Sequence, residues 1–76
     1  MQYTEGQIVV LFKDKVTEAQ AMQLVTSLGL STADKRNWRG LLVIKVPKGE
    51  ELQWVGEFKK QAIVKIAELS HIYQLA

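Results

Sequence analysis

Two short segments of the chain are almost continuously apolar, and they restrict its fold more than any other feature of the sequence. Residues 7–13 read QIVVLFK and residues 41–46 read LLVIKV. β-Branched residues and near-continuous apolarity are typical of strands at the centre of a sheet. We therefore expect both segments to be central strands of one sheet.

A helix is predicted after the first of these strands. Thr17 and Gln20 have the spacing of a capping box, so the helix should begin at Glu18. The apolar residues that follow recur with the period of a helix that has one buried face. Gly29 stands where a left-handed cap closes such a helix.

A second helix is predicted after the segment 41–46. Glu50 and Glu51 would place negative charge at the positive end of its dipole. Gly56, within this helix, is expected to admit a close crossing by a strand. The buried stripe of the helix is predicted to consist of Leu52, Val55 and Phe58.

Two further strands complete the pattern. Residues 30–38 are polar and irregular like an edge strand, and residues 63–67 alternate like a strand with one buried face. The order is that of an α+β, ferredoxin-like βαββαβ fold, a four-stranded antiparallel sheet with two helices on one face. We expect a single domain over residues 1–76, in which residues 69–76 form an extended C-terminal tail.

Two helices cover only one face of such a sheet, so the side chains of the other face are informative. If Lys13, Lys45 and Lys65 point away from the helices, the alternation of each strand is fixed. The core side is then predicted to hold Ile8, Val10, Phe12, Leu42, Ile44, Val46, Val64 and Ile66. The open face is predicted to hold Val9, Leu11, Leu41, Val43 and Ala67. Such an uncovered apolar patch usually marks an interaction site, and a homodimer through it is one alternative.

Residues that could perform chemistry are scarce. The chain has no cysteine and a single histidine, His71, which excludes disulfides and metal sites built from several Cys or His ligands. The acidic residues show no spacing that would pair two carboxylates in a cleft, and no glycine-rich phosphate loop is present. We therefore expect no enzymatic activity, no metal and no cofactor. No apolar run approaches the roughly 20 residues of a membrane span, so no membrane contact is expected.

A basic cluster beside an aromatic residue supports a different hypothesis. Lys35, Arg36 and Arg39 flank Trp38, and a sheet with a basic, aromatic loop is typical of domains that bind single-stranded nucleic acid. The open face, however, offers Val and Leu where such sheets carry stacking rings, and the net charge is only +2. We expect a solvated loop with Trp38 packed on the sheet edge, and weak nucleic-acid binding stays an alternative.

Over most of its length the chain resembles the inhibitor-type propeptides of subtilisin-like serine proteases. The resemblance lies in IVVLFK followed by Asp14, in LVTSLGL, in LLVIKVP, and in VKIAELSH before the tail. The last block is the most specific, because the family has there a hydrophobic strand, an acid, one further residue, and a second acid or Asn. Glu68 occupies the first acidic position, and Ser70 replaces the second.

The resemblance implies an inhibitor, and a folding chaperone, of a subtilisin-like protease. It implies that the sheet packs on two surface helices of the protease through Val9, Leu11, Leu41 and Val43. The N-termini of those helices would be capped by Glu68 and Ser70. The tail would lie product-like in the substrate groove through Tyr73, Gln74, Leu75 and Ala76, with Tyr73 in the large apolar fourth pocket. The chain would be secreted if it is an excised propeptide, and cytoplasmic if Met1 is its natural start.

Overall fold

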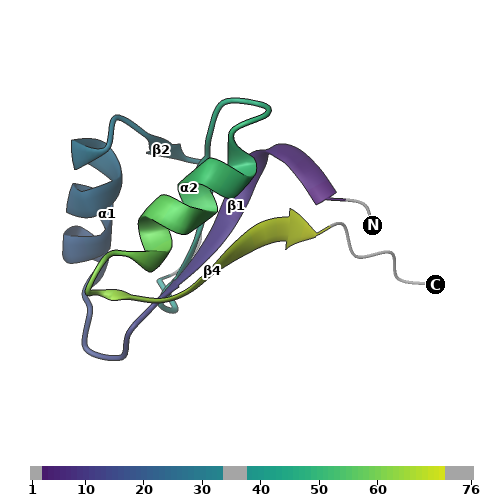
Figure 1. Cartoon of the computed structure of the whole chain (residues 1–76). Coiled ribbons are helices and arrows are strands. Elements are labelled where there is room, and N and C mark those ends of the chain that lie inside the picture. Colours follow the sequence, from purple (N-terminus) through teal and green to yellow (C-terminus); the bar gives the residue numbers. More distant parts are fainter. Residues whose placement is uncertain (1–2, 34–37, 72–76) are drawn as a thin grey trace.

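The chain forms one open sheet with two helices packed against it (Figure 1). The structure is a computed structural model that describes residues 3–33 and 38–71. The strand order is β2-β3-β1-β4, and every neighbouring pair is antiparallel. This arrangement confirms the predicted α+β, ferredoxin-like fold. The elements are β1 (Tyr3–Phe12), α1 (Glu18–Ser27), β2 (Ser31–Thr32), β3 (Leu41–Lys45), α2 (Glu51–Lys59) and β4 (Val64–His71).

The two most apolar strands are central, as their composition predicts. β1 pairs with β3 on one side and with β4 on the other, and Ile8 lies opposite Ile44 in the register. One core cluster joins the strands to both helices, so both helices lie on the same face of the sheet. Its buried apolar members are Ile8, Val10, Phe12, Ala21, Val25, Ile44, Val46, Val55, Phe58, Val64 and Ala67.

Helix α1 begins and ends as the sequence predicts. The Thr17 N–H donates to Gln20 Oε1 at 3.0 Å, and the Gln20 N–H donates to Thr17 Oγ1 at 3.2 Å, which completes the capping box. Gly29 follows the helix with a φ of +76°, in the left-handed region. Ala21 and Val25, four residues apart, are fully buried on the side that faces the sheet.

The buried stripe of α2 differs from the predicted one. Leu52 is 73% exposed, whereas Glu51 is only 3% exposed and joins Val55 and Phe58 on the inner side. Residues 51, 55 and 58 are spaced by four and three, so they share one helix face, and residue 52 lies about 100° away from residue 51. The prediction that Leu52 is buried is therefore wrong.

The carboxylate of Glu51 ties the start of α2 to the sheet. Its Oε2 accepts a hydrogen bond from the backbone N–H of Gly6 at 2.8 Å, and its Oε1 accepts one from the N–H of Gly49 at 3.0 Å. Gly6 lies in an irregular part of β1. Tyr3 pairs with His71 and Ile8 pairs with Leu69, so between these two pairs β1 contains more residues than β4. Its φ of +77° directs the N–H out of the sheet ladder toward Glu51.

A β-bulge near the start of β4 changes which side chains reach the core. Phe12 pairs with Val64 but Leu11 pairs with Ile66, so β4 has one extra residue at this point. The extra residue reverses the alternation that follows, since neighbouring side chains in a strand point to opposite faces. Ile66 is 46% exposed, and Ala67 is buried at 2%. The prediction that placed Ile66 in the core and Ala67 on the open face is wrong.

The outer strands also differ from their predicted lengths. β2 is only Ser31–Thr32, inside the predicted edge strand 30–38, of which residues 34–37 lie outside the described residues. β4 continues to His71 and so includes residues 69–71, which the sequence assigned to the tail. In the described ranges, no helix is long and apolar enough to cross a membrane.

Gly56 offers a stability test, because no strand crosses close to it. A Cβ added there would have no heavy atom within 4 Å outside its own helix, so the predicted close crossing is wrong. Gly56→Ala should raise the free energy of unfolding by roughly 1 kcal/mol, since Ala loses less backbone entropy in a helix. Gly29→Ala is the matched control: it too meets nothing within 4 Å, but its φ of +76° strains an L-residue. Urea denaturation should show stabilisation in the first variant and destabilisation in the second.

The carboxylate of Glu51 should make the stability of the domain depend on pH. Hydrogen bonds from the backbone N–H of Gly6, from its own N–H and from that of Gly49 hold the pKa of Glu51 below its ordinary value of 4.5, against the opposing effect of desolvation. A lowered pKa in the folded state contributes stability above pH 4.5, and this contribution is lost as pH falls through the folded pKa.

We expect Glu51→Gln to lower the urea midpoint at about pH 7, and the difference from the wild type to shrink below the folded pKa. Glu57→Gln is the control, because its salt bridge to Lys60, at 3.4 Å, is exposed and contributes little to stability. A difference between wild type and Glu51→Gln that stays constant down to low pH would contradict this role of the carboxylate.

Candidate docking surface

Apolar side chains gather on the face of the sheet that the helices leave uncovered. Leu41, Leu11 and Ile66 are cross-strand neighbours on β3, β1 and β4, and they form one row across the sheet. Val43 and Val9 form the next row. Leu41 is 47% and Ile66 46% exposed, and the other three side chains are partly buried. These five residues are called the apolar patch below.

The structure places all four predicted contact residues of the sheet in this patch. Val9, Leu11, Leu41 and Val43 alternate with the core residues of β1 and β3, as the lysine positions predict. Ile66 is the member that sequence reasoning missed. Its signal was available, since Val64 and Leu69 are both apolar but five positions apart, and they can face one core only if the strand contains an extra residue.

Two polar residues of β4 border the patch. Glu68 is exposed and lies directly opposite Val9, in the second row of the patch. Ser70 follows two residues later, on the same side of the strand, and is partly exposed. The structure thus brings Glu68 and Ser70 to the same face as the four predicted apolar residues. The remaining predicted contact residues, Tyr73, Gln74, Leu75 and Ala76, lie outside the described residues.

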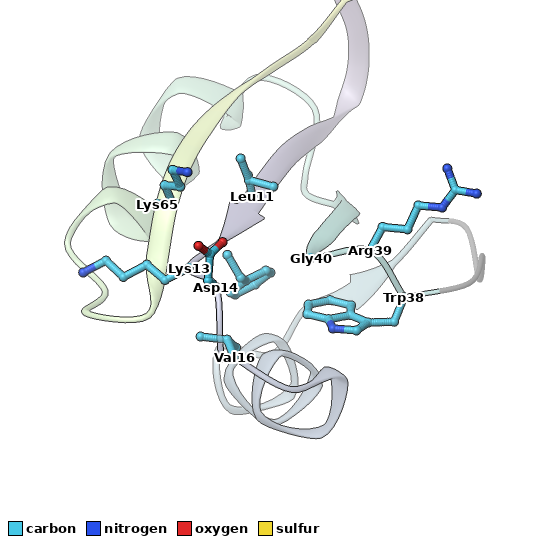
Figure 2. A pocket seen from close by; sticks show the side chains of 9 residues that line it. Leu11, Lys13, Asp14, Val16, Trp38, Arg39, Gly40 and Lys65 are labelled. Atoms are coloured by element: carbon cyan, nitrogen blue, oxygen red, sulfur yellow. The ribbon is translucent and has the colours of Figure 1, made fainter.

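Positive side chains surround a shallow depression of about 390 Å³ at the end of the sheet, where β1 runs into the loop before α1 (Figure 2). Lys13, Arg39 and Lys65, called the basic rim below, line it together with Asp14, Leu11 and Trp38. The Trp38 ring packs on the Phe12 ring with centroids 5.9 Å apart. Trp38 therefore packs on the end of the central strand β1, whereas the sequence predicted packing on the sheet edge.

The described residues contain no cluster of metal-ligating side chains. Within residues 3–33 and 38–71, no group of three or more His, Cys, Asp or Glu side chains could hold a metal ion. Trp54 is used for packing: its ring lies 6.4 Å from that of Phe58, and its Nε1–H donates to Glu50 Oε1 at 3.3 Å. The open face itself presents apolar side chains flanked by charged ones.

Comparison with known proteins identifies the family of the chain. No curated protein and no solved structure gave a significant match to the chain. A family model, described as the fervidolysin N-terminal prodomain, matches residues 1–70. The match covers every strand and helix of the sheet domain except the last residue of β4. The chain therefore belongs to the fervidolysin N-terminal prodomain family, non-catalytic propeptides that serve a subtilisin-like protease as inhibitor or folding chaperone.

Proposed function

We propose that this domain inhibits a subtilisin-like protease by docking the apolar patch on the protease surface and laying its C-terminal segment in the substrate groove. The observation that carries the proposal is the patch itself. Five apolar side chains from three strands lie together on a face that no element of the described chain covers. A patch of this kind, bordered by a polar residue such as Glu68, is typical of a protein–protein contact.

The patch would contribute apolar contact area to the complex. Leu41 and Ile66 still expose nearly half of their surface, so a partner that covers them removes apolar area from water. At about 25 cal/mol per Å², each such side chain contributes on the order of 1 kcal/mol. The partly buried Val9, Leu11 and Val43 would mainly provide shape, because less of their surface remains to be covered.

Glu68 and Ser70 would contact the N-termini of two protease helices. A carboxylate accepts hydrogen bonds from the free N–H groups there and interacts favourably with the helix dipole, while a serine hydroxyl can act as a neutral cap. Both residues stand on the open side of β4 next to the patch, so a helix that packs on the patch could end at either of them. Replacing a second acid by Ser70 would cost about 1 kcal/mol of dipole interaction.

The C-terminal segment would act as an inhibitor strand. Tyr73, Gln74, Leu75 and Ala76 would occupy the four unprimed subsites of the groove, with Tyr73 in the large apolar fourth pocket. The folded body would keep the strand in place and slow its release. This part of the proposal depends on the resemblance, because the family match ends at residue 70.

The chaperone activity follows from the same contacts. A domain that binds the native protease and not the unfolded chain stabilises the native state by mass action. Inhibition and assisted folding would therefore both depend on the affinity of the docked complex.

The C-terminal segment provides the first test of this proposal. The intact chain should inhibit subtilisin, and deletion of residues 73–76 should raise the inhibition constant about tenfold or more, because the groove contacts are lost. Tyr73→Ala should produce part of that effect by emptying the fourth pocket. Titration of subtilisin activity on a small chromogenic peptide measures all three chains. Equal inhibition by the truncated and intact chains would show that the segment does not occupy the groove.

The apolar patch provides a second test with a matched control. Ile66→Asp should raise the inhibition constant about tenfold or more, because a carboxylate would be buried against the protease. Leu52→Asp is the control, since Leu52 is 73% exposed on α2, away from the patch. Far-UV circular dichroism checks that both variants are folded.

The same pair of variants tests the homodimer as an alternative use of the patch. Size-exclusion chromatography with light scattering gives the oligomeric state of the wild type and of Ile66→Asp. A wild-type dimer that Ile66→Asp converts to a monomer, with inhibition unchanged, would assign the patch to self-association instead.

A further inference from the structure

The charges on the open face are distributed unevenly along its strands. Glu68 pairs with Val9, whereas Lys13, the first residue after β1, is four residues from Val9, about 14 Å away at 3.4 Å per residue. The basic rim thus lies beyond one end of the apolar patch, and Glu68 lies near the other end. Leu11 belongs to the patch and also lines the depression, so the two surfaces are continuous.

The basic rim has no charge partner in the part of the chain that the structure describes. Lys13, Arg39 and Lys65 are all exposed, and the one salt bridge between described residues joins Lys60 to Glu57 on α2. Asp14 lines the same depression but forms no ion pair with these cations. The rim therefore has an excess of positive charge on a surface that continues from the patch.

We propose that the basic rim is a second docking element, which binds acidic side chains on the surface of the protease that covers the apolar patch. This inference rests on the proposed function. A protease seated on the patch reaches Leu11, and Lys13 lies only two residues further along the chain, directly after β1. Carboxylates of the protease at this position would pair with the rim at the periphery of the interface, where charge mainly raises the association rate and fixes orientation.

The geometry favours a protein surface over a nucleic acid or a single anion. Figure 2 shows the Lys13 and Arg39 side chains pointing to opposite sides, so they do not converge on one small ion. The carboxylate of Asp14 lines the depression and would repel a phosphate placed there. The Trp38 ring is partly buried and packs on Phe12, so less of its surface is left for a base to stack on.

Glu68 and the rim together would orient the partner. A protease helix whose N-terminus lies at Glu68 would extend along the patch for about 14 Å, or roughly nine residues at 1.5 Å each, before it reaches the rim. Its C-terminal carbonyl groups, which carry the negative end of the dipole, would then face Lys13 and Lys65. The other lysine of the face, Lys45, pairs with Gln7 on the β3 side and is separated from Glu68 by β1.

Charge reversal at the rim tests the inference. The double variant Lys13→Glu/Lys65→Glu should raise the inhibition constant against subtilisin about tenfold or more at low salt. The difference from the wild type should shrink at moderate salt, because the charges are exposed and screened. The matched control is Lys48→Glu/Lys59→Glu, which makes the same change of net charge at exposed lysines outside the open face and should leave inhibition nearly unchanged.

A neutral variant, Lys13→Gln/Lys65→Gln, keeps the test valid if the reversed charges disturb folding, and it should show the same effect at a smaller size. Equal inhibition by the wild type and the neutral variant would overturn the role of the rim while leaving the proposed function intact. A wild type that does not inhibit subtilisin would overturn both. Salt-sensitive binding of a short single-stranded oligonucleotide that the rim variants lose, with inhibition unchanged, would assign the rim to nucleic acid and also overturn the inference.

Discussion

Two short helices can cover only one face of a four-stranded sheet, and this limit determines the rest of the molecule. The core of the described chain lies on one side of the sheet, where strands β1, β3 and β4 meet α1 and α2. The alternation of side chains then places every second residue of the same strands on the other side. On β1 and β3 these residues include Val9, Leu11, Leu41 and Val43, so the fold produces an apolar surface from the same strands that build its core.

The β-bulge in β4 changes which side chains this surface presents. The bulge in β4 moves the small side chain of Ala67 into the core and the larger one of Ile66 onto the open face. A regular strand continued from the Phe12–Val64 pair would have placed Lys65 opposite Leu11 and Ala67 opposite Val9, and the apolar patch would have been smaller. Bulges are often found where a strand must redirect a functional side chain, and this one enlarges the contact area at the edge of the sheet.

Much of the fold could be predicted because its signals are local. The capping box of Thr17 and Gln20, the glycine after α1 and the apolar strands each depend on a few neighbouring residues. Ile66 and Leu52 were misplaced for a common reason. Their orientation depends on where an element begins or gains a residue, and such a shift by one position moves a side chain to another face. The burial of Glu51 depends on Gly6, a residue 45 positions away, and no local pattern reports that contact.

The pairing of the outer strand has a consequence for how the two ends of the domain depend on each other. β4 has β1 as its one neighbour in the described sheet, and the pairing of the two strands extends to Tyr3 opposite His71. The first residues of β1 thus support the last residues of β4 by pairing with them. The hydrogen bond from Gly6 to Glu51 holds this part of β1 against α2. Changes at the amino-terminal strand would therefore be transmitted to the carboxyl-terminal one without passing through the core.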